Sequence, residues 1–457
     1  MHLIGEANSA QKNMKLFCWR ELIAISFLTI GAFQSSGVTF SNLPTSVSNT
    51  FSGILTLQIS GVTPGDTVMI QRYLDVNNSG TIDAADWLVE QFSVTDGQAA
   101  TIGGITNFNV PGDADAVAGS ITTTLPFQPP ALNGDIAQDY CANYLFRLSS
   151  PGGHFAPITN SLAVTGFPFA QSVSGSVLAS GLALPFAAVL ALQQNGGPVA
   201  ATLADGSGHY SLKLPPGAYQ LAGIASNLVI NLGLAPKILL LPGLNLSTNL
   251  NLTSASQTIS GRVANTNDAS IGLPGFLVLA TDTNFFLGAT LSDANGNFTI
   301  GTRPSTWNLS VSSGGNSLHG YLTTQNKVRV NSGGGSVGGV NLFLPPATAM
   351  FYGTVTDDHG NPMPGIPLNA QDASGQFADN VATRPDGSFN AGGMAGAWTL
   401  QLNNVTGPLT NYLFTPPASV SFSSNQAVQV NFTGILSTNH LSGVVTKSSG
   451  GAVIGVE

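Results

Sequence analysis

The residues whose types and spacing best suit chemistry lie between Asp75 and Asp86, in the segment DVNNSGTIDAAD. Charged residues make up only 8% of the 457-residue chain, yet this segment holds three aspartates in twelve positions. A calcium-binding loop takes oxygen ligands at positions 1, 3, 5, 9 and 12, a backbone carbonyl at position 7 and glycine at position 6. Counted from Asp75, Gly80 falls on position 6 and Ile82 on the apolar position 8. The candidate ligands are Asp75, Asn77, Ser79, Thr81 through its carbonyl, Asp83 and Asp86.

These ligands predict a structural Ca²⁺ site, because Ca²⁺ is a hard cation that takes about six to eight oxygen ligands. Only three of the ligands are carboxylates, which suits a modest affinity matched to millimolar extracellular Ca²⁺. The alternative is a polar Asn-Ser-Gly turn that binds no metal.

The segment resembles the loops of EF-hand and dockerin modules, and aspartate at its last position matches the dockerin version. Dockerins carry two such loops, whereas this chain has one. Residues Met69 to Leu74 before the loop alternate like a strand rather than an entering helix, while Ala84 to Gln91 is compatible with a short exiting helix. We therefore expect a calcium loop inserted in a β-domain.

Other chemistry-bearing strings lack a supporting context. Asp113 and Asp115 form a second acidic pair, which we interpret as a solvated turn. The stretch from Gly333 to Gly338 fits both the nucleophile-elbow and the dinucleotide strings, but no strand-to-helix transition surrounds it. The histidines lack metal-ligand spacing along a helix. We therefore predict a non-enzymatic protein with no catalytic residues and no organic cofactor.

The composition predicts an all-β protein. The chain contains 54 glycines and 26 prolines, far more than helices tolerate, and 43% of its residues are hydrophobic. This mixture is typical of short strands joined by tight turns around packed cores. The net charge is -9 and no basic run is present, so we do not expect a nucleic-acid partner.

The first 36 residues are predicted to be a secretory signal peptide. An apolar run from Leu22 to Phe33 follows Lys12, Lys15 and Arg20, which is the layout of such a peptide. The alternative is an N-terminal anchor that stays in the membrane. No later apolar stretch is long enough to span a bilayer, and Cys141 is the one cysteine after the signal peptide, so no intrachain disulfide is expected. We therefore expect a secreted or cell-surface protein.

A repeat of about 90 residues occupies the rest of the chain. Its first landmark is a glycine within an apolar strand, at Gly175, Gly261, Gly353 and Gly443, with spacings of 86, 92 and 90. A fixed period of this kind indicates repeated structural units.

Further landmarks keep the same period. A proline turn follows the first strand at Pro185, Pro274 and Pro364. Next comes a hairpin turn that begins at Asp205, Asp293 and, as a departure, Arg384. The next strand opens with Tyr210, Phe298 and Phe389, and nine residues later each copy has an aromatic residue two positions before leucine, at Tyr219, Trp307 and Trp398. These aromatic residues are predicted to fill sandwich cores. Each unit closes with alternating apolar residues, Leu250-Asn-Leu252, Val340-Asn-Leu342 and Val430-Asn-Phe432.

This set of landmarks resembles the carboxypeptidase regulatory-like family, over residues 171–457. The resemblance implies a prealbumin-like fold, a seven-stranded antiparallel β-sandwich, and it brings no catalytic residues. The predicted organisation is therefore a signal peptide (1–36), an N-terminal β-domain with the calcium loop (37–170), three sandwich repeats (171–257, 258–349 and 350–437) and the start of a truncated fourth repeat (438–457).

The function that these features predict is an exported, non-catalytic structural or adhesive protein with a calcium-stabilised N-terminal domain. Its expected partner is an unknown extracellular protein or glycan. Two alternatives stay open, namely the accessory region of a larger secreted hydrolase and a carbohydrate-binding module.

Overall fold

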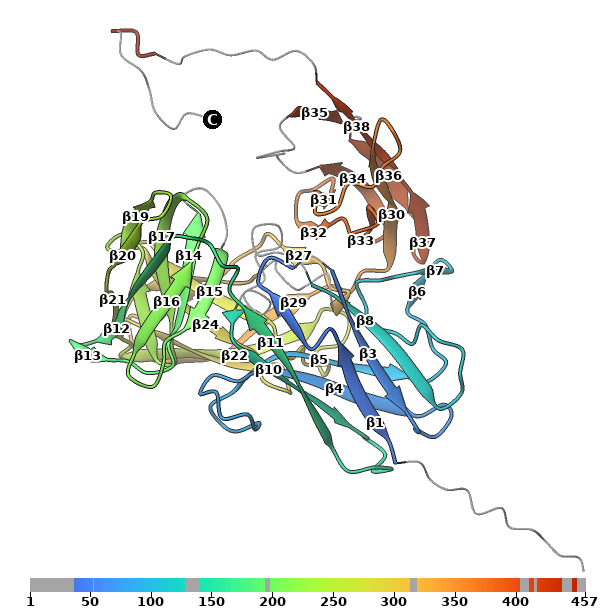
Figure 1. Cartoon of the computed structure of the whole chain (residues 1–457), viewed down its shortest axis with the longest axis horizontal. Coiled ribbons are helices and arrows are strands. Elements are labelled where there is room, and N and C mark those ends of the chain that lie inside the picture. Colours follow the sequence, from blue (N-terminus) through green and yellow to red (C-terminus); the bar gives the residue numbers. More distant parts are fainter. Residues whose placement is uncertain are drawn as a thin grey trace, which may run out of the picture. The chain divides into compact units, whose positions relative to one another are not determined.

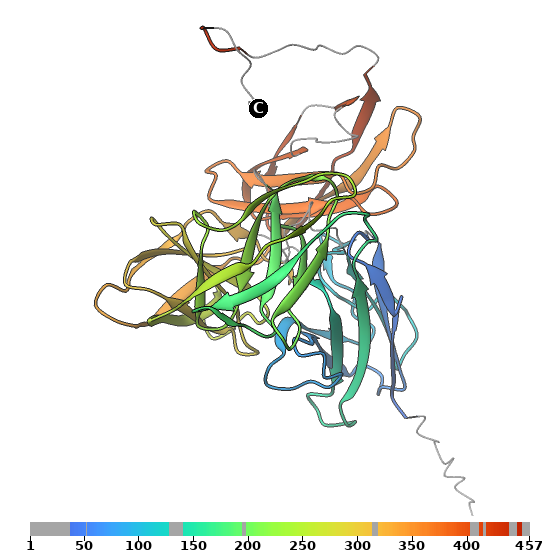
Figure 2. The same ribbon diagram turned by 60° about the vertical axis from the view of Figure 1, so that its left-hand side comes forward.

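The computed structural model describes residues 37–51, 53–127, 140–193, 198–312, 319–402, 411–414, 417–437 and 446–449. The predicted signal peptide lies outside these residues, and so does nearly all of the truncated fourth repeat. The described residues contain strands, turns and loops and no α-helix (Figures 1 and 2). The predicted fold class, all-β with tandem antiparallel sandwiches, is confirmed. Residues from Val38 onward form one compact unit.

The N-terminal domain is built from two facing sheets. One sheet has the order β1-β3-β8 and the other the order β2-β11-β10-β4-β5. Side chains that alternate along β3 and β4, such as Leu57 and Ile70, are buried between the sheets. The strands are β1 (Thr39–Leu43), β2 (Ser46–Ser48), β3 (Ile54–Ser60), β4 (Thr67–Leu74), β5 (Trp87–Thr95), β8 (Ser120–Pro126), β10 (Asn143–Ser149) and β11 (Ile158–Thr165), with a small hairpin of β6 (Thr101–Ile102) and β7 (Ile105–Thr106) and a short β9 (Tyr140–Cys141).

Copy 1, copy 2 and copy 3, the three repeats that follow, share one pairing scheme. In each copy the first strand pairs antiparallel with the fourth strand and parallel with the last. In the second sheet, the second strand (β14, β23 or β31) lies between the third (β15, β24 or β32) and the fifth (β17, β26 or β34). The fifth strand also pairs with β19, β28 or β36. A separate hydrophobic core lies in each copy.

The strands that carry these roles have the following bounds. Copy 1 contains β12 (Ser172–Ala179), β13 (Leu182–Ala183), β14 (Ala188–Gln193), β15 (Pro198–Leu203), β16 (His209–Lys213), β17 (Gly217–Ile224), β18 (Leu228–Asn231), β19 (Lys237–Leu240), β20 (Asn245–Ser247) and β21 (Leu250–Ser254). Copy 2 contains β22 (Gln257–Asn265), β23 (Leu277–Asp282), β24 (Phe286–Leu291), β25 (Asn297–Thr302), β26 (Thr306–Val311), β27 (Thr323–Thr324), β28 (Val328–Asn331) and β29 (Val337–Leu344). Copy 3 contains β30 (Ala349–Asp357), β31 (Pro367–Asp372), β32 (Phe377–Ala382), β33 (Ser388–Gly393), β34 (Gly396–Leu402), β35 (Tyr412–Phe414), β36 (Ala418–Phe422), β37 (Gln426–Gln429) and β38 (Phe432–Leu436).

The landmark glycine of each first strand lies where a carbonyl in or just before the last strand approaches closely. A Cβ on Gly175 would lie 1.8 Å from the oxygen of Thr248, and a Cβ on Gly353 would lie 1.7 Å from the oxygen of Val430. Since real side chains never come so near a carbonyl, only glycine fits. The same glycines stand opposite the landmark aromatic residues of the fourth strands, in the pairs Gly175–Tyr210, Gly261–Phe298 and Gly353–Phe389.

This register corrects one landmark of the repeat. Leu250 in copy 1 pairs with Val177, as Leu342 pairs with Val263 and Phe432 with Val355. The closing motif of copy 1 is therefore Thr248-Asn-Leu250, and not Leu250-Asn-Leu252. The shift by two residues preserved the alternation, so the sequence pattern could not reveal it.

The landmark aromatic residues are core residues, as predicted. Trp307 is fully buried, and its ring nitrogen donates a hydrogen bond to the carbonyl of Arg303 at 2.9 Å. The hydroxyl of Tyr219 makes the equivalent bond to the carbonyl of Pro215 at 2.8 Å. Because their faces are covered, these rings offer no stacking platform for a sugar. The buried set comprises Tyr210, Tyr219, Phe298, Trp307, Phe389 and Trp398.

Candidate functional site

The candidate calcium loop connects two antiparallel neighbours of the N-terminal sheet. Leu74 at the end of β4 pairs with Trp87 at the start of β5, so the loop closes a long hairpin. The expected entering strand is thus confirmed. The short exiting helix with which Ala84 to Gln91 was compatible does not form, because residues 84–86 make a turn and β5 begins directly after them. The chain must reverse here to pair with β4, which leaves no room for a helix.

Asp75, the first candidate ligand, is held inside the loop. Its side chain is buried and the residue is only 1% exposed. One carboxylate oxygen accepts a hydrogen bond from the amide of Ser79 at 2.8 Å, and the other accepts one from the amide of Gly80 at 2.9 Å. Gly80 has a φ of 71°, a left-handed conformation that explains the glycine at this position. The Asp75 carboxylate therefore holds the first half of the loop in place through these two hydrogen bonds.

Asp86, the last candidate ligand, closes the loop from the other end. Its two oxygens accept hydrogen bonds from the amides of Val76 at 3.1 Å and Asp83 at 3.0 Å. In between, the Asn77 amide donates to the Asp83 carboxylate at 2.9 Å. The Ser79 hydroxyl donates to the carbonyl of Thr81 at 2.8 Å. All six residues singled out in the sequence therefore belong to one hydrogen-bonded loop.

The electrostatics of the loop are those of crowded negative charge. Burial raises the pKa of Asp86, and the nearby charges of Asp83 and Asp75 raise it further. Hydrogen bonding from Asn77 lowers the pKa of Asp83, so this carboxylate stays ionised. Among the described residues, none of the three aspartates forms a salt bridge. A loop that is rich in oxygen ligands, and whose buried Asp75 carboxylate has no salt bridge among the described residues, fits a hard divalent cation.

The three carboxylates do not converge tightly on one point. Among the described residues, three carboxylate or imidazole ligand atoms lie within 4.8 Å of one another only at Asp357, Asp358 and His359. That group lies in an exposed turn, where the Asp357 carboxylate already accepts hydrogen bonds from the amides of His359 and Asn361. In the Asp75–Asp86 loop the remaining ligand oxygens would come from Asn77, Ser79 and the carbonyl of Thr81.

A cavity of about 370 Å³ adjoins the loop. Asp86 and Trp87 form part of its wall, together with the ring of Tyr73. Tyr73 and Trp87 are both partly exposed residues, and polar residues of copies 1 and 2 also line the cavity. The polar lining residues are Ser226, Asn227, Thr290, Ser292, Asp293 and Thr299. This cavity could not be predicted from the sequence, because its walls come from distant segments.

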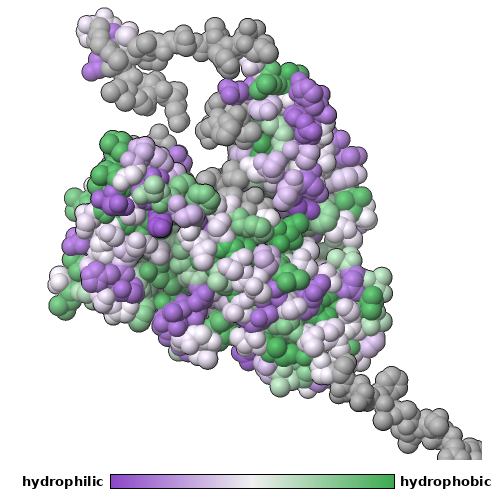
Figure 3. All heavy atoms as spheres, viewed as in Figure 1, coloured by the Kyte–Doolittle hydropathy of each residue, from purple (hydrophilic) through white to green (hydrophobic). Residues whose placement is uncertain are grey.

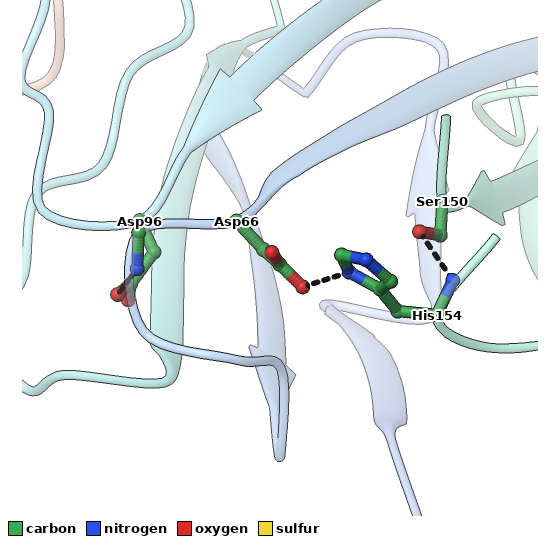
Figure 4. Close-up of polar contacts among 5 residues, drawn as sticks. Asp66, Asp96, Ser150 and His154 are labelled. Atoms are coloured by element: carbon green, nitrogen blue, oxygen red, sulfur yellow. Dashed lines mark hydrogen bonds and ion pairs between the residues drawn. The ribbon is translucent and has the colours of Figure 1, made fainter. Parts of the chain in front are cut away.

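A second group in the N-terminal domain has the residue types of a catalytic triad but not the geometry (Figure 4). His154 lies 2.7 Å from Asp66 through its Nδ1 atom, and this contact lowers the pKa of Asp66. The Ser150 hydroxyl, however, accepts a hydrogen bond from the main-chain amide of His154 at 3.0 Å, and not from its ring. With no ring nitrogen directed at the serine, the arrangement does not activate a nucleophile.

Asp113 has a structural role that the sequence did not reveal. It was expected in a solvated turn with Asp115, but it is buried, and its carboxylate accepts hydrogen bonds from the amides of Gly97 and Thr122. It therefore holds a loop rather than facing solvent. Ser336, in the glycine-rich string, accepts a hydrogen bond from the amide of Thr258 and lies just before β29, so the strand-to-helix setting of a nucleophile is absent there.

The sequence matches no protein-family model and no curated protein. Among the described residues, no helix has the length and apolar character needed to cross a membrane. Three of the solved structures to which the chain is similar come from Bacillus and Streptococcus species. They are the Bacillus anthracis TIE protein (12% identity, 88% of this chain and 75% of that chain, TM-score 0.20), BcpA, the major pilin subunit of Bacillus cereus (12%, 58% and 99%, TM-score 0.18), and GBS52, the minor pilin of Streptococcus agalactiae (10%, 41% and 99%, TM-score 0.21).

Proposed function

We propose that this chain is an exported, non-catalytic structural or adhesive protein whose N-terminal domain is stabilised by Ca²⁺. The observation that carries the proposal is the loop from Asp75 to Asp86, in which six oxygen-bearing residues of the calcium template form one network around a buried carboxylate. The tandem sandwiches that follow are typical of modules that set spacing and rigidity. The predicted signal peptide and a loop suited to millimolar Ca²⁺ both favour an extracellular setting.

Calcium would act on stability rather than on chemistry. The ion would neutralise the carboxylates of Asp75, Asp83 and Asp86. It would also favour the ionised form of Asp86, whose pKa is raised by burial first and by the charges of the other two aspartates second. A ligand that binds only the folded state stabilises it by RT ln(1 + [L]/Kd), about 1.4 kcal/mol at ten times Kd. Melting of the N-terminal domain would then rise by about 3–6 °C.

The test is a melting experiment on the full chain in 2 mM Ca²⁺ (about the extracellular level) and in chelator. The parent is expected to melt higher in Ca²⁺, and the double variant Asp75→Ala with Asp83→Ala is expected to lose that difference. A matched control replaces the turn aspartates Asp205 and Asp293 with alanine, which should leave the Ca²⁺ effect intact. Calorimetric titration with Ca²⁺ alone gives a direct readout. Equal melting of the parent in Ca²⁺ and in chelator would reject the proposal.

A second candidate function is binding of a carbohydrate in the cavity beside the loop. The observation that favours it is the pairing of two partly exposed aromatic rings, Tyr73 and Trp87, with a polar opposite wall. A glycan array probed with the full chain, and with Trp87→Ala as its matched variant, tests this function. Binding that survives the Trp87 change, or a silent array, would argue against it.

A further inference from the structure

Each sandwich has its third strand covered by a short strand from the module before it. In copy 2, β24 pairs with β18 of copy 1, through Ile230–Leu287 and Asn231–Phe286. In copy 3, β32 pairs with β27 of copy 2, and Thr324 stands opposite Phe377. Phe286 and Phe377 are both the first residues of their strands, so the two junctions use the same register. An edge strand is thereby closed at each junction.

Copy 1 has its third strand covered too, by a different donor. Here β9 of the N-terminal domain pairs with β15 in parallel, with Tyr140 opposite Ala201. The second sheet therefore has the order β19-β17-β14-β15-β9 in copy 1 and β27-β32-β31-β34-β36 in copy 3. In copy 2 the equivalent order is β18-β24-β23-β26-β28. All three third strands of the described chain are thus occupied.

β35 is the counterpart of β18 and β27 in copy 3. The donor segment of each copy first pairs with the end of its own last strand, in the pairs Leu228–Ser254, Tyr321–Pro346 and Tyr412–Leu436. In each copy this partner lies four residues beyond the landmark apolar residue of the last strand. Among the described residues, β35 pairs with β38 alone, so its other edge has no strand beside it.

The central side chain of the donor segment distinguishes the open end from the two closed junctions. Val229 is 1% exposed and belongs to the core of copy 2, and Leu322 is 0% exposed and belongs to the core of copy 3. Leu413 occupies the same position in copy 3 and is 65% exposed. Ile435 and Leu436 of the neighbouring β38 are exposed as well. Hydrophobic surface is visible in Figure 3 at this end of the molecule.

We propose that β35 is a donor strand for a further sandwich of this repeat, whose third strand it pairs with and whose core receives Leu413. The two existing junctions are the model for the interface, because main-chain pairing would supply affinity and the buried leucine would supply specificity. A second copy of this chain does not fit the role, since its third strands are already covered by β9, β18 and β27. The partner is therefore a sandwich of this repeat type with a free third strand.

The test appends such a sandwich to the full chain. Residues 348–437 are duplicated directly after Ser437, which keeps the 90-residue register of Gly353 and Gly443. In this extended chain, Leu413→Asp is expected to lower the melting temperature of the added sandwich by about 10 °C, as expected for a charge placed in a core. In the parent chain the same substitution should change melting by less than about 2 °C, because Leu413 is exposed there. Leu234→Asp, at an exposed leucine of copy 1, is the matched control in both chains.

A second measurement covers the case in which the added sandwich does not fold. A synthetic peptide of residues 375–384, which contains the third strand of copy 3, is added to the parent chain. Slower hydrogen exchange at the amides of Leu413 and Phe414, lost in Leu413→Asp, supports the proposal. No protection by the peptide together with no Leu413 effect in the extended chain overturns it. Dimers of the parent that Leu413→Asp dissociates also overturn it, because the occupant would then be a second copy.

Discussion

Copies 1 and 2 differ from copy 3 at the hairpin turn before the fourth strand. In copies 1 and 2 an aspartate opens the turn and its carboxylate accepts hydrogen bonds from turn amides. Asp205 accepts from Ser207 at 2.8 Å and from His209 at 3.0 Å. Asp293 makes the equivalent bonds at 2.8 and 2.9 Å. In these two copies the aspartate side chain accepts its hydrogen bonds from within its own turn.

Copy 3 keeps the backbone of the turn and uses the side chain elsewhere. The amide of Gly387 donates to the carbonyl of Arg384 at 2.8 Å, as the amide of Gly208 donates to that of Asp205 at 2.9 Å. The Arg384 guanidinium donates to Asn390 at 2.9 Å and lies 3.5 Å from the ring centre of Phe108. Burial of this group lowers its pKa to about 10. The turn is thus specified by its backbone, and the side chain at its first position is free to take another role.

The largest expected effect concerns a feature that all copies share. Gly353→Ala places a Cβ 1.7 Å from the oxygen of Val430, so β30 and the segment that joins β37 to β38 must separate. We expect a loss above about 4 kcal/mol, in the range of exceptional substitutions, and selective unfolding of copy 3 by limited proteolysis. Gly334→Ala, where nothing lies within 4 Å of the added carbon, is the control. A folded copy 3 in Gly353→Ala would show that the close approach is not a constraint.

The next effect is a pH dependence that copy 3 alone should show. Asp379 is buried on β32, where the equivalent positions in copies 1 and 2 are Ala200 and Gly288. Burial raises its pKa to about 7, against 3.8 for the ordinary group. The folded state therefore holds the proton more tightly. Its contribution to stability is complete below pH 3.8 and is lost as pH rises through 7.

Asp379→Asn should remove this dependence. The amide oxygen can still accept the hydrogen bond from Gly392, and no charge is buried. Above pH 7 we expect the variant to be more stable than the parent by at most about 4 kcal/mol, and near pH 4 the two should be similar. Urea unfolding from pH 4 to 8 measures the difference. A parent and variant with parallel pH profiles would show that Asp379 ionises freely in the folded state.

A smaller effect is expected from giving copy 3 the residue of the other copies. Arg384→Asp should keep the turn but lose the contacts with Asn390 and Phe108 and bring a second carboxylate near Asp386. We expect a loss of about 2–3 kcal/mol. A double-mutant cycle with Phe108→Ala measures the coupling. Additive losses would mean that the ring and the guanidinium do not interact, and would leave copy 3 no different from copies 1 and 2.

The sequence predicted the parts of the fold that depend on local pattern. Alternating residues and turn dipeptides identified the strands, and the fixed spacing of Tyr219, Trp307 and Trp398 identified core positions. It also identified the calcium-type loop as a loop. The short exiting helix with which Ala84 to Gln91 was compatible does not form, because local propensity is overridden by pairing of β5 with β4.

Features set by distant segments were not predictable. The donor strands β18, β27 and β35 are two to four residues long and share no motif, so their roles follow only from what lies beside them in space. Some buried charged residues lie in strands whose sequences show the usual alternation of apolar and polar residues. Examples are Asp379 and the ion pair of Arg72 with Glu90, whose charged groups are 3.1 Å apart. Whether a polar residue faces water or a neighbouring module depends on packing between modules, which a single sequence pattern does not encode.

The smallest effect tests whether the aspartate of copies 1 and 2 is needed for the turn at all. Asp293→Ala removes an acceptor for the amides of Asn295 and Asn297 in an exposed turn, so we expect a loss of about 1 kcal/mol. The backbone bond from Gly296 to the carbonyl of residue 293 should remain, since Gly296 has a φ of 80° that alanine at position 293 does not disturb. Hydrogen exchange at the Gly296 amide checks this bond, and Asp293→Asn, which keeps the acceptor, is the control. Rapid exchange at Gly296 in Asp293→Ala would mean that the side chain specifies the turn, and that Arg384 must supply an equivalent constraint through Asn390 in copy 3.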